Sequence, residues 1–283
     1  MISQREEEFI LGKAYIPEHI VPLMVGISQG EPYFRDDYFF LVKDDLLIFI
    51  GYPLGNDFRE KIFASALRKA MGDFQPAHTW FIVPEGPESF FSVGQRSEKD
   101  EYFRLDLRDH KIKSGLKRSL EKASQNLTVH KNRCMSPEHL ALTQEFLEKE
   151  NLSPRVKELY RRIPPYLVHS KTSLLLSARD EQENLSAYYV LELGARTFAT
   201  YVSGCFSRKH YVPHASDLLF LEMTNVARET GKEYVHLGLG VNEGIRRFKK
   251  KWGGMPSLSY EFWEIISRPR SPLFWIQALQ GKI

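Results

Sequence analysis

The order of expected secondary-structure elements occurs twice along the chain, and this repeat constrains the fold more than any other feature. In the first half, aromatic and β-branched runs at 38–42 and 46–52 predict a hairpin. A helix is expected next, with Asp57 as its N-cap and Gly72 at its end, and a strand is expected at 79–83. This half therefore has the order hairpin, helix, strand, which is typical of helices packed on a sheet.

The second half shows the same order without obvious residue identity. Runs at 186–193 and 196–206 predict a second hairpin, and Ser216 is expected to cap a helix that ends at Gly231. A predicted strand at 234–237 completes the order. The two halves are thus expected to contain one fold twice.

A helical stretch separates the two halves. The apolar spacing predicts an amphipathic helix over 114–125. Ser136 and Ser153 each precede a proline, as N-cap residues do, and Pro164–Pro165 are expected to end the last helix. We therefore expect a helical insert at 114–165.

The chain length agrees with two domains. At about 150 residues per domain, 283 residues suffice for two hydrophobic cores. No low-complexity linker marks the boundary, which we place near 102–109, giving domains at 1–105 and 106–283. The predicted class is α/β (α+β), with a mixed, mostly antiparallel sheet and flanking helices in each domain.

Composition excludes several classes of protein. Cys134 and Cys205 are the only cysteines, so neither a disulfide framework nor a four-cysteine zinc site can form, and a reducing compartment is expected. No apolar run approaches the roughly 20 residues of a membrane helix, and the first residues have no apolar leader segment. We expect a cytoplasmic protein without a transmembrane segment.

The net charge of +3 conceals an uneven distribution. Residues 108–133 carry eight Lys or Arg and two acidic residues, a net +6, and 246–251 carry +5, which leaves −8 elsewhere. Lys117, Arg118, Arg246 and Arg247 belong to these clusters. If the fold brings the clusters together, they would attract an anionic ligand; each cluster alone is more typical of a solvated helix face.

Three segments together resemble the Fem-type aminoacyl and peptidyl transferases of the GNAT (Gcn5-related N-acetyltransferase) superfamily. They are the strand and helix at 102–123, the strand and long helix at 201–231, and the motif H-L-G-L-G with R-F-K at 236–253. Proteins of this family contain two GNAT-like domains, so the resemblance also implies the tandem repeat. It implies a transferase, an acyl-CoA or aminoacyl-tRNA donor and an amine acceptor, such as a peptide or cell-wall precursor.

The sequence departs from the family at two places. The loop at 207–214 has no glycine, whereas acetyl-CoA-dependent members grip the pyrophosphate with a glycine-rich turn. The family aspartate near the end of the strand is replaced by His236 or Leu237. No tightly bound cofactor is expected, and acyl-CoA enters only as a candidate co-substrate.

Lys249 is the first candidate for catalysis. Acyl transfer to an amine needs positive charge or N–H donors where the tetrahedral oxyanion develops. The resemblance aligns the pair Phe248-Lys249 with the family's reaction centre, whereas the sequence alone also allows an exposed helical lysine.

A phosphate site is expected where Arg208 and Lys209 precede the helix that begins at Ser216, because a helix N-terminus offers free N–H groups to an anion. Tyr201 and Tyr211 are candidate proton donors, with packing as the alternative. A metal site from Cys205 and the nearby histidines is not expected, because proline interrupts that stretch. The sequence thus favours an acyltransferase, the alternative being a non-catalytic module that binds an anionic ligand or a lipid or cell-wall precursor.

Overall fold

The computed structural model describes residues 1–90, 94–108 and 110–267, and the chain divides into two compact units. Unit 1 comprises Gly30–Lys99 and the segment from Tyr260 onward, together with Met1. Unit 2 comprises Ile2–Gln29 and Asp100–Ser259. The sequence-based division into 1–105 and 106–283 therefore differs from these units at both ends of the chain, because each terminal segment packs on the more distant part of the sequence.

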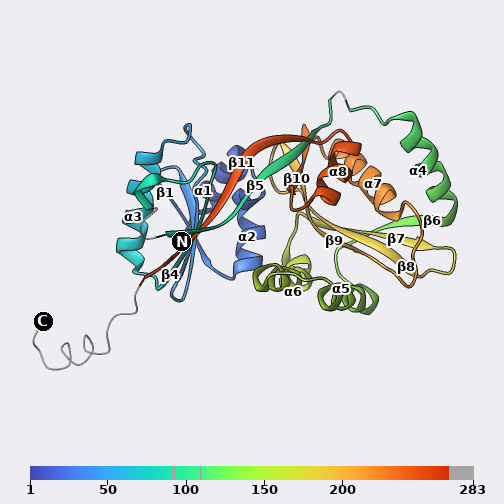
Figure 1. The fold of residues 1–283 in the computed structure, drawn as a ribbon, viewed down its shortest axis with the longest axis horizontal. Coiled ribbons are helices and arrows are strands. Elements are labelled where there is room, and N and C mark those ends of the chain that lie inside the picture. Colours follow the sequence, from blue (N-terminus) through green and yellow to red (C-terminus); the bar gives the residue numbers. More distant parts are fainter. Residues whose placement is uncertain (91–93, 109, 268–283) are drawn as a thin grey trace, which may run out of the picture. The chain divides into compact units, whose positions relative to one another are not determined.

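Unit 1 contains a mixed sheet with a helix on one face (Figure 1). The central pair of β3 and β4 is parallel and the other neighbours are antiparallel. In spatial order the strands are β1 (Glu31–Arg35), β2 (Tyr38–Lys43), β3 (Leu46–Ile50), β4 (His78–Val83) and the second part of β11 (Met255–Ile266). The predicted hairpin and strand of the first half are confirmed by β2, β3 and β4.

Helix α3 (Glu60–Phe74) packs an aromatic core against this sheet, and a short 3-10 helix, η2 (Glu88–Phe90), follows β4. The predicted ends of α3 are wrong: the N-cap is Arg59, and the helix continues through Gly72 to Phe74. Phe74 packs edge-on against Tyr33 at 4.8 Å between ring centroids, so the last turn is stabilised by packing that local propensity does not include.

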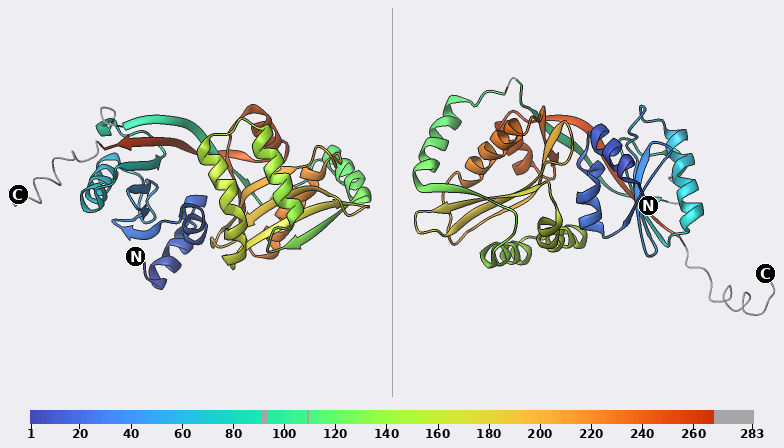
Figure 2. Two further views of the ribbon diagram at one scale, coloured as in Figure 1. Left: turned by 90° about the horizontal axis from the view of Figure 1, so that it is seen from below. Right: turned by 180° about the vertical axis from the view of Figure 1, so that it is seen from behind.

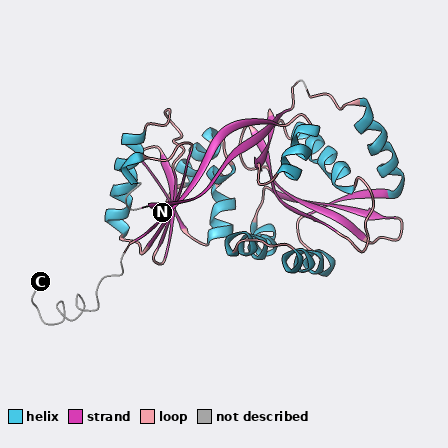
Figure 3. Cartoon of the chain, in the orientation of Figure 1, coloured by secondary structure: helices cyan, strands magenta, loops and turns pink. Residues whose placement is uncertain are grey.

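Unit 2 also contains a mixed sheet (Figure 3). Only the pair of β10 and β9 is parallel. In spatial order the strands are β5 (Gly94–Asp106), β10 (Tyr234–Leu239), β9 (Phe198–Phe206), β8 (Leu185–Glu192), β7 (Ser173–Asp180) and β6 (Leu127–Asn132). The predicted second hairpin is confirmed by β8 and β9, and the predicted strand by β10.

Helices cover both faces of this sheet (Figures 1 and 2). One layer contains α4 (Ser114–Asn126), α7 (Ala215–Glu229) and α8 (Glu243–Lys251), and the other contains α5 (Pro137–Lys149) and α6 (Pro154–His169). Strand β8 shows why: Tyr189 and Leu191 point to the α7 core, whereas Tyr188 and Val190 point to the core beneath α5 and α6. All residues of β8 are buried, as expected of a central strand covered on both sides.

The first residues of the chain also belong to unit 2. They form α1 (Gln4–Lys13), the short 3-10 helix η1 (Pro17–His19) and α2 (Val21–Ser28), and a capping box of Ser3 and Glu6 begins α1. Ala14, Ile20 and Leu23 pack against Tyr166 of α6 and Phe198 of β9. Among the described residues, none of the helices combines the length and apolar character that crossing a membrane requires.

The segment predicted as a helical insert at 114–165 contains three helices and also strand β6 at the edge of the sheet. Helix α6 does not end at Pro164–Pro165, as predicted, but continues to His169. Tyr166 and Leu167 are 3% and 1% exposed, so burial of the turn after the prolines offsets the backbone hydrogen bonds that proline removes.

A buried carboxylate holds the end of α6 to the end of β8. Glu192 is fully buried and accepts hydrogen bonds from Tyr166 Oη, the backbone N–H of Leu193 at 2.9 Å and that of Gly194 at 2.6 Å. Such a group is stabilising only while its donors remain paired.

Replacing Glu192 with Gln should destabilise the fold by about 2–4 kcal/mol, because an amide N–H₂ would face donors that need an acceptor. Glu150→Gln is the matched control, since the Glu150 side chain is 42% exposed in its pair with Arg208 and should contribute less than about 1 kcal/mol. Urea unfolding of both variants measures the difference. Equal losses would contradict the structural role of Glu192.

Candidate active site

The parallel ladder between β9 and β10 is short, and it ends where the candidate site begins. It runs from Tyr234 opposite Phe198 to His236 opposite Thr200, although the strands continue to Leu239 and Phe206. Beyond His236, β10 also shifts register against β5, and Gly238 adopts a φ of 71°. The two strands thus carry backbone groups beyond the ladder that an extended ligand can meet.

Lys249 lies beside this end of β10. It is 7% exposed, its Nζ donates to the carbonyl of Leu239, and the ammonium lies 5.5 Å from the centre of the Phe103 ring. Burial lowers the pKa of Lys249 to about 7, although the charge of Asp100 opposes this shift. Lys249 is therefore not an exposed helical lysine, and both of its protonation states are populated near neutral pH.

Acidic residues of β5 hold the first turns of α8 in place. Arg246 pairs with Asp100 and, at 2.7 Å, with Glu101, while the N–H of Val241 donates to Asp100 at 2.7 Å. Asn242 caps α8 by accepting from the Ile245 N–H at 3.0 Å. Arg246 is thus neutralised by its neighbours and is not a free surface charge.

A carboxylate of the chain itself, that of Asp217, lies at the N-terminus of α7. Asp217, in the first turn, is 4% exposed and accepts from Trp252 Nε1 at 3.0 Å, His214 Nδ1 at 3.0 Å and Lys251 Nζ at 2.5 Å. Burial acts to raise its pKa, but these hydrogen bonds prevail and lower it. Ser216 is not the N-cap that the sequence predicts, because His214 occupies that position with a φ of 67°.

Arg208, a residue of the predicted phosphate site, forms an ion pair within the chain. Arg208 pairs with Glu150 at 3.0 Å, at the end of α5, which covers the face of the sheet opposite α7. Both cations also help Lys149 to lower the pKa of Glu145 on α5. Arg208 thus lies beside α5, and the phosphate site of Arg208, Lys209 and Ser216 stays a prediction.

The two tyrosines predicted as proton donors differ in their surroundings. Tyr201 is the first residue of β9 beyond the ladder and packs edge-on against Tyr189 at 4.9 Å between centroids. Burial raises the pKa of Tyr201 well above its usual value, so the hydroxyl keeps its proton. Tyr211, in contrast, is 62% exposed.

Cys205 is buried with its Sγ 3.3 Å from Tyr188 Oη, and burial raises the pKa of this thiol to about 12, which disfavours a nucleophilic thiolate.

Exposed basic side chains gather on α4 and on the segment that precedes it. Five basic side chains of this region are exposed and have no hydrogen bond or ion pair within the described part of the chain: those of Lys111, Lys113, Lys117, Arg118 and Lys122. In the second cluster, Arg247 and Lys250 remain exposed. The two clusters adjoin at one end, where His110 Nε2 lies 2.8 Å from the carbonyl oxygen of Trp252.

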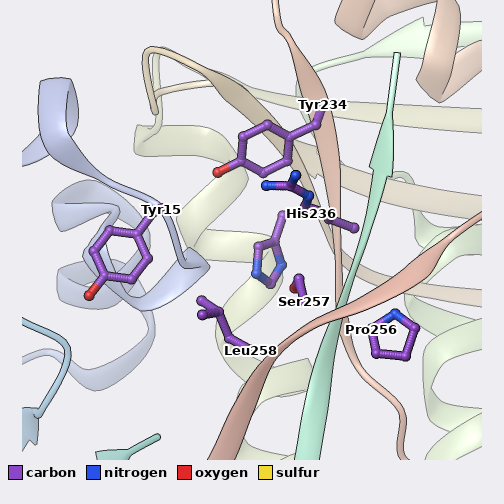
Figure 4. A pocket seen from close by; sticks show the side chains of 7 residues that line it. Tyr15, Tyr234, His236, Pro256, Ser257 and Leu258 are labelled. Carbon is purple, nitrogen blue, oxygen red and sulfur yellow. The ribbon is translucent and has the colours of Figure 1, made fainter. Parts of the chain in front are cut away.

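A cavity of about 370 Å³ lies against the end of the β9–β10 ladder, and no sequence pattern predicted it (Figure 4). It is open to solvent and is built from β5, β10, β11 and the link between α1 and η1. Its lining residues are Tyr15, Arg104, Tyr234, His236, Pro256, Ser257 and Leu258. All of them belong to unit 2.

His236 contributes a buried donor to this cavity. It is 1% exposed, its Nδ1 accepts from the N–H of Gly238 at 3.2 Å, and its Nε2 has no hydrogen-bond partner among the described residues. Burial, with the charge of Lys249 next in effect, lowers the pKa of His236 to about 3. The ring is therefore neutral with its proton on Nε2, and leaving this donor unpaired costs about 1–3 kcal/mol.

Arg104 contributes a cation to the same cavity. Its guanidinium lies 5.5 Å from the centre of the Tyr234 ring, and the side chain is exposed. The neighbouring carboxylate of Asp106 pairs with Arg108 at 2.6 Å, and within the described residues Arg104 has no hydrogen bond or ion pair. The sequence held one signal, since alternation along the strand places Tyr102 and Arg104 on one face of β5.

Comparison by sequence finds no match for this chain, whereas comparison by structure finds several. No protein-family model and no curated protein matches the sequence. In structure, the chain has the tandem GNAT fold, as the resemblance to the Fem-type branch predicted.

Three solved structures show this fold over nearly the whole chain. FemX has a TM-score of 0.61 at 11% identity, covering 98% of this chain and 98% of its own. L-PGS from Bacillus licheniformis has a TM-score of 0.58 at 15% identity, covering 98% and 96%. A tandem GNAT protein from the clavulanic acid biosynthesis pathway has a TM-score of 0.58 at 15% identity, covering 94% and 95%.

Lys249→Met should stabilise the protein by about 1–4 kcal/mol at pH 7, because an apolar chain of similar length replaces a buried cation. The folded-state pKa of about 7 lies below the ordinary value of 10.5, so folding releases protons and wild-type stability should rise with pH between these values. Thermal unfolding at pH 7, 8 and 9 measures both effects.

Lys250→Met is the matched control, since Lys250 is the exposed neighbour of Lys249 on the same helix. Its melting temperature should stay close to that of the wild type. A destabilised Lys249→Met variant would show that the buried cation is favourable for folding.

Proposed function

We propose that this chain is an acyltransferase that transfers an aminoacyl or acyl group from an activated, phosphate-bearing donor to an amine. The observation that carries the proposal is Lys249, a buried lysine whose pKa of about 7 and position beside the diverging ends of β9 and β10 suit a reaction centre. The fold supports it, because the solved structures that share this fold include proteins named as transferases of the GNAT superfamily.

The proposed reaction needs only groups of this chain and its two substrates. The neutral amine attacks the carbonyl carbon of the donor, and protonated Lys249 donates a hydrogen bond to the oxyanion that forms. Collapse of this intermediate breaks the bond to the leaving alcohol or thiol, which takes up a proton as the amine nitrogen releases one. Tyr201 is the proposed donor of that proton, since burial keeps its hydroxyl protonated at the opening of the ladder.

Two observations favour aminoacyl-tRNA over acyl-CoA as the donor. The carboxylate of Asp217 already occupies the first turn of α7, so a pyrophosphate at this N-terminus would meet a negative charge. The exposed basic side chains of α4, including Lys117 and Arg118, suit the backbone of a nucleic acid. The proposed acceptor is an amine, with peptides and cell-wall precursors as candidates, and acyl-CoA remains the second donor.

Lys249→Ala should lower kcat by about 10²- to 10³-fold while the Kd for the donor changes little, because the lost contact forms mainly in the transition state. Lys250→Ala is the control and should keep wild-type turnover. Single-turnover kinetics with aminoacyl-tRNA and a small amine acceptor separate the two parameters. Unchanged turnover in Lys249→Ala would exclude this residue from the reaction.

The pH dependence of kcat/KM should follow from the pKa of Lys249. Because the protonated form stabilises the oxyanion, activity should fall as the pH rises through about 7, while deprotonation of the acceptor amine acts in the opposite direction. In Lys249→Arg, the fall at alkaline pH should disappear, since a guanidinium stays protonated throughout. A fall that persists in this variant would assign it to another group.

Donor binding should show the salt dependence of a nucleic-acid complex. The double variant Lys117→Gln/Arg118→Gln should reduce the slope of log K against log salt by about 2 in magnitude, one for each lost phosphate contact. The control is Arg161→Gln/Arg162→Gln on α6, whose side chains pair with Glu158.

Thermal-shift measurements with acyl-CoAs complete the test of the donor. Stabilisation by acyl-CoA alone would identify acyl-CoA as the donor. If neither donor binds, the chain is a non-catalytic module with this fold.

A further inference from the structure

We propose that the cavity formed by Tyr15, Arg104, Tyr234 and His236 binds an oxyanion, a carboxylate or phosphate group, carried by the acceptor. This inference rests on the proposed function, because it names the chemistry by which the acceptor is held. Two groups that lack a partner in the described chain, a buried imidazole N–H and an exposed guanidinium, line the same cavity (Figure 4).

The imidazole is held in a fixed tautomer. Because the N–H of Gly238 occupies Nδ1 at 3.2 Å, the neutral ring of His236 can only donate from Nε2. Tyr102 and Phe198 pack against the ring at 5.0 and 5.7 Å between centroids, so it cannot turn away without losing these contacts. The protein thus keeps a buried donor ready for an acceptor atom that its own described residues do not provide.

The guanidinium supplies the charge for this site. Arg104 lies directly opposite His236 in the antiparallel pairing of β5 and β10, so the two side chains share one face of the sheet. Stacking on Tyr234 orients the planar guanidinium and leaves its N–H groups available to an anion. A carboxylate or phosphate can accept from both residues at once, whereas a cation or an apolar group satisfies neither.

The position of the cavity connects it with the reaction. His236 is the last residue of β10 in the ladder with β9, and the carbonyl that binds Lys249 Nζ belongs to Leu239, three residues further along the strand. Three residues of a strand span about 10 Å. Lys249 packs on Phe103 in the α7 core, whereas Arg104 points to the other face of the sheet. An acceptor held in the cavity would therefore extend past the unpaired ends of β9 and β10 to place its amine near Lys249.

The size and walls of the cavity limit the ligand. About 370 Å³ accommodates a small molecule or the end of a larger one, and the rings of Tyr15 and Tyr234 form part of the wall. The predicted acceptor thus has an amine, a separate acidic group and a short segment that can pack on aromatic rings. Both carboxylates and phosphates meet this description.

Binding can be measured without the donor by ¹⁵N NMR of the histidine side chains. Four probes, acetate, benzoate, inorganic phosphate and phenyl phosphate, are titrated into the full chain at pH 7. We expect at least one probe to shift the Nε2 resonance of His236. Benzoate should bind more tightly than acetate, and phenyl phosphate more tightly than inorganic phosphate. A preference for benzoate or for phenyl phosphate identifies the acidic group as carboxylate or phosphate.

Two variants test the site. Arg104→Gln should weaken binding of the best probe at least tenfold, and His236→Asn should do the same, because Asn retains an acceptor near the Gly238 N–H but lacks the Nε2 donor. Arg108→Gln is the matched control, since it removes a neighbouring exposed arginine that pairs with Asp106. Its affinity should equal that of the wild type.

The outcomes separate this inference from the proposed function. No shift of His236 with any probe, or equal affinity in Arg104→Gln and the wild type, overturns the anion site whatever the enzyme's activity. A shift that Arg104→Gln weakens, together with unchanged turnover in Lys249→Ala, supports the anion site and removes only the assigned role of Lys249. In turnover with the natural class of acceptor, Arg104→Gln should raise KM for the acceptor more than it lowers kcat.

Discussion

The early end of the β9–β10 ladder is the constraint on which the candidate site depends. Parallel strands in a covered sheet normally continue their pairing, because unpaired backbone groups are costly away from water. Here pairing stops at His236 and Thr200, and a register shift and a positive φ follow on β10. The side chains that suit chemistry, Lys249 and Tyr201, lie next to this interruption, and so does the cavity of His236.

Burial without an ion-pair partner gives the site its chemical character. Lys249 and His236 are both removed from solvent, and in each the neutral form is favoured more than in water. The acidic residues near α8 are engaged with Arg246, so they do not restore the charge of Lys249 fully. Such arrangements lower the stability of a fold, and proteins retain them where the altered groups act on a ligand.

The sequence predicted much of the fold and part of the site. Hairpins, strands and the long helices follow from local periodicity, so both halves of the repeat were found. Helix ends were less accurate, because Phe74 and Tyr166 extend α3 and α6 through tertiary packing that no local pattern contains. The resemblance to a family motif singled out Lys249, but nothing in the sequence predicted that this lysine is buried. The pairing of Arg208 with Glu150 could not be predicted because the two residues lie far apart in sequence, and the cavity was missed because its residues come from four separate segments.

The connectivity of the two units has a consequence for how the chain can be divided. The backbone passes between the units at four places, after Met1, Gln29, Lys99 and Ser259, and the last two crossings lie inside β5 and β11. A single cut near residue 100 would therefore leave one fragment without the strand that borders β4 and the other without the helices that cover Phe198. Gene fragments that end at the centre of the repeat do not correspond to folding units. The fold occurs twice, but the two copies do not correspond to two separate lengths of the chain.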